Sequence, residues 1–263
     1  MEKNNMFRRQ RFCKKLFPLS ECLRVYVGKQ HVEVGEMGKS TGKGQYEGEP
    51  SLAFRDVKDI NAPWRSVLSL ARQSRRAKGA QVQQGKELLF LERGKLRLTY
   101  QNQDGAEKIL WYIREGCLFG EAPFFDPMPN EGFFTCVTDC LIYTFSAQAV
   151  AQISKERPDL LLNLLQSMSR KLRIMSYHAS SLYLDDMLVR ICKFLAQRLV
   201  PDSNPLTAKI GISRQEMASL LGMHRISLYR VLRQQEEYGL FGPIKGNTMT
   251  ILRPHEFYKL AEK

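Results

Sequence analysis

The chain has 263 residues, a formal net charge of +13 and 43% hydrophobic residues. This length accommodates two modest domains, each with its own core, and the composition is ordinary for a globular protein. No apolar run approaches the ~18 residues of a membrane-spanning helix, and the basic N-terminal segment lacks the apolar region of a secretory signal. We therefore expect a cytoplasmic protein without a membrane partner, whose positive charge favours a polyanion.

The cysteines and histidines form no recognisable catalytic or metal-binding set. The six cysteines contain no CxxC pair, so no ready-made zinc site is expected, and in a cytosolic protein they should be reduced, buried thiols. The four histidines form neither an HExxH motif nor a plausible triad. We therefore expect no metal ligands and no enzymatic activity.

Residues 1–60 are expected to form an N-terminal extension with few predictable elements. Leu16–Val27 is compatible with a short helix or a strand, and the glycine-rich residues 35–50 predict a loop. The run GEMGKST at 35–41 suggests a phosphate-binding loop, but that motif requires a glycine where this chain has Glu33. A P-loop NTPase is therefore not expected.

Residues 63–145 change from a helical to a strand-like pattern. Apolar residues at 64, 67, 68 and 71 predict a helix over 63–76. Short alternating or apolar runs follow, separated by turn signals such as Asp104-Gly105. The predicted strands are Leu88–Leu91, Lys95–Asn102, Glu107–Ile113, Phe133–Thr138 and Leu141–Phe145. Strands with this spacing imply a β-sandwich or a roll.

Residues 158–182 show a heptad pattern that predicts a long helix paired with a second copy. Apolar or small residues recur at intervals of four and three over three heptads, as in a coiled-coil seam. The seam consists of Leu161, Leu165, Met168, Leu172, Met175, Ala179 and Leu182. Alternatively, the helix packs only on the core of its own chain. The two interpretations are compatible if one face of the helix pairs with a second subunit and another face packs on the roll. Asp185 then can cap a second predicted helix, Met187–Leu199.

Residues 213–232 have the residue types of a helix-turn-helix. Ser213 precedes the first helix as an N-cap, and Glu216 completes a capping box. Gly222 lies where the turn between the helices requires a positive φ angle, which glycine adopts without steric cost. The alternative is an ordinary αα-hairpin.

Residues 241–252 predict a β-hairpin after these helices, because Gly246-Asn247 lies between two β-prone runs. A hairpin this short needs a surface to pack on, and the second helix is the obvious partner. Together these elements predict a winged helix, whose second helix can enter the DNA major groove.

The run 212–232 resembles the DNA-binding domain of the CRP/FNR family of transcription regulators. FPLSECLR at 17–24, REGCLFGEAPFFD at 114–126 and GMHRISLYRVL at 222–232 resemble the CprK-like halorespiration-regulator subgroup. The resemblance implies an α+β chain whose β-roll (cupin-like) sensor domain occupies residues 61–150. A dimerisation helix and hinge at 151–184 and a C-terminal winged helix-turn-helix domain at 185–263 would follow.

The resemblance leaves the cofactor open. Cyclic-nucleotide members carry an Arg that binds the cyclic phosphate, whereas the corresponding stretch here is Gly132-Phe133-Phe134-Thr135. Because a buried phosphate without a charged partner is costly, a cyclic nucleotide is not the expected effector. A cyclic-nucleotide-binding module nevertheless stays an alternative, as do a haem sensor using His178, an iron–sulfur cluster and a thiol–disulfide switch.

The resemblance also implies which residues contact double-stranded DNA. The residues expected to face the bases lie on the second helix, which starts near His224. They are Arg225, Ile226, Tyr229 and Arg230. Those suited to the phosphates are Ser213, Gln215, His224 and Ser227, and Arg214 lies among them.

A small-molecule effector is expected between the roll and the dimer helix. The candidate lining residues are Arg97, Tyr112, Gly120, Glu121, Arg173, Tyr177 and His178. Their alternative role is that of ordinary surface and interface residues. We thus predict a homodimeric, effector-gated transcription regulator that binds a two-fold symmetric promoter site, with RNA polymerase as a further partner.

Overall fold

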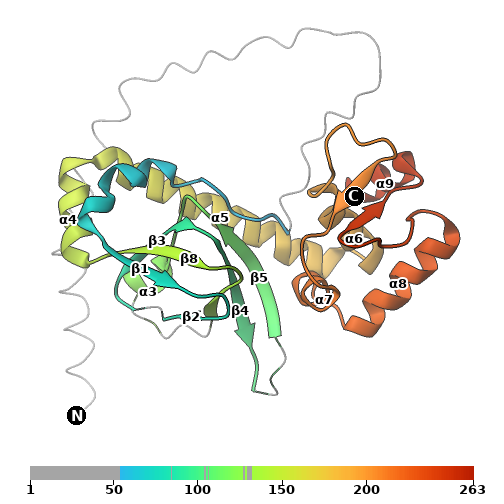
Figure 1. The fold of residues 1–263 in the computed structure, drawn as a ribbon, viewed down its shortest axis with the longest axis horizontal. Helices are drawn as coiled ribbons and strands as arrows, with labels where there is room; N and C mark the ends of the chain where they lie inside the picture. The colour runs from blue at the N-terminus through green and yellow to red at the C-terminus, as the bar shows by residue number, and fades with distance from the viewer. Residues whose placement is uncertain (1–53, 84, 104, 106, 127, 129–131) are drawn as a thin grey trace, which may run out of the picture.

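The computed structural model describes residues 54–263, except residues 84, 104, 106, 127 and 129–131 (Figure 1). The predictions for Leu16–Val27 and for the phosphate-loop-like run lie outside this part of the chain. Within it, no helix is both long and apolar enough to cross a membrane.

Two four-stranded antiparallel sheets form the N-terminal β-roll, and the core lies between them (Figure 1). In spatial order, one sheet holds β1 (Arg72–Arg76), β8 (Cys140–Phe145), β3 (Leu88–Arg93) and β6 (Cys117–Phe119). The other holds β2 (Gln81–Val82), β7 (Gly132–Cys136), β4 (Lys95–Gln101) and β5 (Glu107–Arg114). The alternating apolar residues of β4 and β8 point into this core, as their sequence pattern predicts. Strand β3 is instead buried on both faces: Leu89 and Leu91 lie in this core, and Leu88 and Phe90 lie in a second cluster with residues of η1 and the helices.

The five predicted strands are confirmed, but the predicted helix over 63–76 is wrong in its second half. A 3-10 helix, η1 (Ala62–Leu70), buries Trp64 and Val67, and the chain then extends into β1. Strand β1 pairs with β8 from Arg72 to Arg76. Its side chains are mostly exposed, so no apolar alternation marked it as a strand; its backbone pairing at the sheet edge overrides the helical pattern.

The long helix α5 (Pro158–Leu184) follows α3 (Glu121–Phe125) and α4 (Ala147–Glu156) and confirms the helix predicted from the heptads. Each residue that α5 buries precedes a residue of the predicted seam by one position in the sequence. This inner face consists of Leu160, Leu164, Ser167, Lys171, Ile174, His178 and Ser181. The predicted residues are here called the outer seam, and they are only partly covered: Leu165 is 48% and Leu172 69% exposed, and Ala179 is exposed as well. The other four are half-buried: Leu161, Met168, Met175 and Leu182.

The C-terminal domain is a winged helix that ends in a further helix. Its elements are α6 (Met187–Ala196), β9 (Thr207–Lys209), α7 (Arg214–Leu221), α8 (Arg225–Tyr238), β10 (Thr248–Thr250) and α9 (Pro254–Ala261). The predicted turn is confirmed, because Lys245 and Thr248 exchange backbone hydrogen bonds around Gly246-Asn247. The sequence did not indicate β9, which precedes the helix-turn-helix and pairs with β10.

The two domains share buried side chains at one edge of the roll. Phe54, Ile109 and Tyr112 belong to the same hydrophobic cluster as the helices of the C-terminal domain. Phe54 and its neighbours up to residue 60, which the sequence assigned to the extension, therefore pack as part of the folded structure. The Lys108 ammonium of β5 donates hydrogen bonds to the carbonyls of Ser219 and Leu220 in α7.

A glycine of the roll provides a test of its packing. Gly94 has φ +105°, and a Cβ there would lie 2.5 Å from the Asp139 carbonyl oxygen and 2.7 Å from Cys140 Sγ. We expect Gly94→Ala to lower the free energy of unfolding by at least ~3 kcal/mol, because backbone strain and overpacking add. Gly79→Ala is the control, since Gly79 has φ +85° but open space around it, and should cost only ~1–2 kcal/mol. Equal losses in urea unfolding would contradict this account.

The half-buried Lys108 predicts how stability depends on pH. Burial, and next the nearby Arg190 guanidinium, lower the pKa of Lys108 to about 7. Since the unfolded ammonium keeps a pKa near ~10.4, the unfolded state holds more protons between about pH 7 and 10. The free energy of unfolding should therefore rise with pH in this window, by at most ~1.4 kcal/mol per unit.

The measurement is urea unfolding of the wild type and of Lys108→Met between pH 7 and 8.5. The free energy of unfolding of the wild type relative to that of the variant should increase across this range, because only the wild type carries the lysine whose pKa the fold lowers. His178 contributes little to the effect: burial lowers its pKa to about 4, so it is neutral in the folded protein, and above pH 7 the unfolded imidazole, with a pKa near ~6.5, is mostly neutral as well. A constant difference between the two proteins would show that folding does not lower the pKa of Lys108.

Candidate nucleic-acid interface

The first helix of the helix-turn-helix begins at a complete capping box. The Ser213 hydroxyl accepts a hydrogen bond from the Glu216 backbone N–H at 3.2 Å, and Glu216 Oε2 accepts from the Ser213 backbone N–H at 3.0 Å. The same hydroxyl lies 2.9 Å from Glu216 Oε2. Ser213 thus fixes the start of α7 as predicted, but its hydroxyl hydrogen is already engaged by a carboxylate.

The turn between the helices needs glycine for two reasons. Gly222 has φ +61°, and a Cβ there would lie 2.6 Å from Leu182 Cδ2 at the end of α5. The positive φ confirms the prediction, while the close approach to α5 could not be known from the sequence. His224 then caps α8, because its Nδ1 accepts from the Ile226 backbone N–H at 3.3 Å.

The outer face of α8 is open to solvent. Ile226 is 60% and Tyr229 50% exposed, and Arg225 and Arg230 are exposed beside them. Leu228, on the opposite side of the helix, is fully buried. The four side chains expected to face DNA bases therefore lie together on a surface that the protein leaves uncovered.

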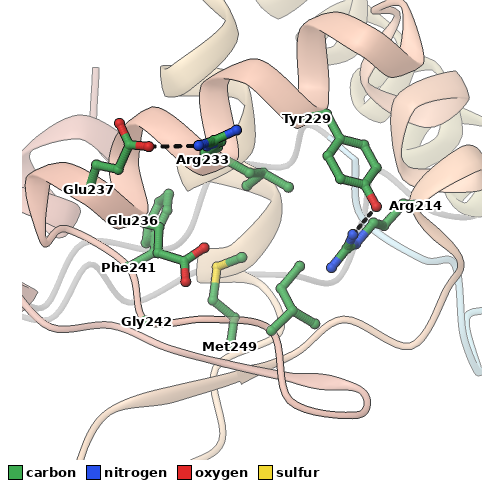
Figure 2. A pocket seen from close by; sticks show the side chains of 10 residues that line it. Arg214, Tyr229, Arg233, Glu236, Glu237, Phe241, Gly242 and Met249 are labelled. Carbon is green, nitrogen blue, oxygen red and sulfur yellow. Dashed lines mark hydrogen bonds and ion pairs between the residues drawn. The ribbon is translucent and has the colours of Figure 1, made fainter.

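Arg214 and Tyr229 join the two helices at the edge of this surface. The Arg214 guanidinium donates a hydrogen bond to the Tyr229 hydroxyl and lies 4.7 Å from the centre of its ring (Figure 2). They line one end of a groove of about 460 Å³ between α8 and the wing. At the other end lie Glu236 and Glu237, the latter paired with Arg233 (Figure 2). The carboxylates disfavour phosphate there, so the basic end is the one suited to DNA.

Two of the remaining predicted phosphate contacts, Gln215 and His224, lie at a second groove. Gln215, His224 and Arg225 line a groove of about 710 Å³ between the helix-turn-helix and the β4–β5 hairpin. Arg97 and Lys108 of the hairpin also line it. Ser227, half-buried on the first turn of α8, is not among its lining residues.

The predicted effector residues do not converge on one site. Arg97 faces α7, where its guanidinium pairs with Glu216 at 3.3 Å. Tyr112 is fully buried beside Lys95, whose ammonium lies 3.8 Å from the ring centre. Burial raises the pKa of the Tyr112 phenol well above its usual value.

The other predicted effector residues belong to α3 and α5. Gly120 begins α3 with φ +80°, and the adjacent Glu121 carboxylate pairs with the Lys171 ammonium on the inner face of α5. The ammonium also donates to the Leu118 carbonyl at 2.6 Å. Sequence analysis missed Lys171, because a lysine on an amphipathic helix is ordinarily solvated.

The three predicted residues of α5 are divided between its faces. Arg173 is exposed and Tyr177 is 49% exposed, so both point away from the roll. His178 is buried, lies edge-on to Phe54 at 4.5 Å between ring centres, and is 3.2 Å from Lys108 Nζ. These contacts enclose the imidazole.

The described thiols have the properties of packing groups. Cys117, Cys136, Cys140 and Cys192 are free and buried. Burial raises the pKa of Cys117 to about 11 and of Cys192 to about 12, so neither is a reactive thiolate near neutral pH. Among the described residues, no group of three or more His, Cys, Asp or Glu side chains is placed to hold a metal.

Comparisons with known proteins agree with this arrangement. Residues 80–157 match the cyclic nucleotide-binding domain family, and residues 189–260 match the Crp-like helix-turn-helix domain. The chain is 28% identical over 168 residues to the cAMP-activated global transcriptional regulator CRP of Pasteurella multocida, across 62% of this chain and 80% of that protein. It is also 28% identical over 171 residues to the cAMP-activated regulator Vfr of Pseudomonas aeruginosa, across 62% and 79%.

Solved structures share the fold. CprK in complex with OCPA superposes with a TM-score of 0.68 at 17% identity, covering 80% of this chain and 97% of CprK. A CooA variant from Carboxydothermus hydrogenoformans gives a TM-score of 0.66 at 17% identity, covering 78% and 100%. With both domains present in this order, the chain belongs to the CRP/FNR family of transcription regulators, and it carries an effector-binding domain and a DNA-binding helix-turn-helix domain.

Proposed function

We propose that this regulator binds a two-fold symmetric DNA site as a homodimer, under the control of a small molecule bound by the roll. The observation that carries the proposal is the division of α5 into a buried inner face and an outer seam in which Leu165 and Leu172 are exposed. Uncovered leucines at heptad spacing are typical of a helix that pairs with a second copy. RNA polymerase is the proposed further partner.

In such a dimer, each protomer places α8 in the major groove. The two half-sites then lie one DNA turn apart, about 34–36 Å. Arg225, Ile226, Tyr229 and Arg230 face the bases, while Gln215 and His224 lie toward the phosphates. Because Ser213 is engaged in its capping box, its contribution is to fix the start of α7 rather than to donate to DNA.

The structure offers a cyclic nucleotide a poor site. Strand β7 holds Phe133 and Phe134 where the resemblance to cyclic-nucleotide-binding members implies a phosphate-binding Arg. Lys171 supplies a cation near the Gly120-Glu121 segment, but Glu121 already neutralises it. A cyclic phosphate would have to displace this carboxylate, so we favour another small molecule as effector, although the relatives CRP and Vfr are described as cAMP-activated.

The dimer is tested by Leu172→Lys. The substitution places two ammonium groups against each other in the middle of the apolar outer seam, which costs several kcal/mol. We expect a monomer in size-exclusion chromatography with light scattering. Arg173→Lys, next to it on the exposed surface, is the control and should stay dimeric. A dimeric Leu172→Lys protein would rule out pairing through the outer seam.

DNA contact is tested by selecting binding sites from a randomised duplex library. Ile226 cannot accept a hydrogen bond, so it favours a thymine methyl, and each half-site should contain an A·T pair there. Arg230→Ala should lose ~1–3 kcal/mol of discrimination at one base pair per half-site.

The matched control is Gln215→Ala, which should weaken binding to all sequences alike, because a phosphate contact carries no sequence information. If Arg230→Ala selects the same sites as the wild type, or if a C·G pair is selected opposite Ile226, α8 is not docked on DNA as proposed.

A further inference from the structure

The C-terminal domain packs against the outer edge of one sheet of the roll. Strand β5 is the last strand of its sheet, and an edge strand leaves backbone N–H and C=O groups without partners. The Ser219 hydroxyl of α7 accepts a hydrogen bond from Ile109 N at 2.9 Å and donates one to the Glu107 carbonyl at 2.8 Å. One side chain of the helix-turn-helix thus satisfies two backbone groups of the roll.

Lys108 of β5 lies between these two residues, and its side chain contacts two further elements, α7 and α5. Its ammonium donates to the carbonyls of Ser219 at 3.0 Å and Leu220 at 2.6 Å, near the end of α7. The carbonyls in the last turn of a helix lack helical N–H partners, and the Lys108 side chain supplies a donor to two of them. The ammonium also lies 3.2 Å from Nε2 of His178, on the inner face of α5. The roll, the dimer helix and the helix-turn-helix therefore meet at one side chain.

Further contacts hold the same two surfaces together. Asp56, before the roll, pairs with Arg198 after α6 at 3.2 Å. The buried side chains of Ile109 and Tyr112 extend the hydrophobic cluster of the C-terminal domain into β5. The C-terminal domain is therefore packed on the roll rather than connected only through the link between α5 and α6.

We propose that Lys108 and Ser219 are positioning residues for DNA binding. They hold α7, and through the tight turn also α8, at a fixed place on the roll, so that the two α8 helices of a dimer keep the separation that a two-part DNA site requires. In this arrangement the outer face of α8 stays exposed, so the docked domain is free to meet DNA. The inference rests on the homodimer proposed above.

The test compares Ser219→Ala and Lys108→Met with the wild type on two duplexes. One duplex carries the full site obtained by selection, and the other has one half-site scrambled. Loss of docking lowers the fraction of dimers with correctly spaced helices, so affinity for the full site should fall about tenfold. Affinity for the single half-site should change less than about twofold, because α8 itself is untouched. Ser154→Ala, on α4, is the control and should match the wild type on both duplexes.

Hydrogen exchange at the Ile109 amide measures docking without DNA. Lys108→Met leaves the Ser219 hydroxyl in place, so faster exchange at this amide in that variant reports opening of the domain rather than loss of the bond. Exchange in β3 (Leu88–Arg93) should stay unchanged, which shows that the roll remains folded.

Three results would overturn the inference. These are an unchanged affinity for the full site, an equal loss on both duplexes, or unchanged exchange at Ile109 in Lys108→Met. If the wild type itself binds the full site no better than the half-site, the proposed dimer fails, and the exchange measurement still decides whether Lys108 docks the domain.

Discussion

The division of α5 into two adjacent faces constrains the rest of the structure. A helix can present apolar groups to two partners only if their stripes are offset around its axis, and here the offset is one residue, or about 100°. The inner face holds Leu160, Leu164 and Ile174 against the roll, while Leu165 and Leu172 remain outside. The same helix can therefore belong to the core of one protomer and supply a surface to a second.

The two faces differ in chemistry as well as direction. The outer seam is almost wholly apolar, whereas the inner face includes Ser167, Lys171, His178 and Ser181. Buried polar groups are stable only with partners, and Lys171 finds Glu121 and the Leu118 carbonyl. Because such partners must be correctly placed, the inner face fixes the position of α5 on the roll more narrowly than apolar packing alone would.

Local signals explain what the sequence could predict. The capping box of Ser213 and Glu216, the turn at Gly222 and the hairpin turn at Gly246-Asn247 depend on residues a few positions apart, and all three are present. The heptad pattern likewise predicted α5, since helical periodicity is local.

Long-range pairing explains what it could not predict. Strand β1 has only a weak pattern of its own and forms because β8 offers a backbone partner. The buried inner face of α5 could not be predicted, because it contains polar residues at 167, 171, 178 and 181, and such side chains are ordinarily solvated. The contact of Lys108 with α7 could not be predicted either, because its partners there are backbone carbonyls, which every residue has.

The inner face also joins the effector-binding domain to the DNA-binding domain. Lys171 contacts α3 of the roll, and His178, two helical turns further along, contacts the Lys108 that is bonded to α7. Ser181 then bonds Asp185, which pairs with Lys193 of α6 at 2.7 Å. A single helix thus carries a continuous series of contacts that begins at Glu121 beside the roll and ends at α6 and α7 of the DNA-binding domain. The contacts that hold α5 in place are therefore also the ones that join the two domains.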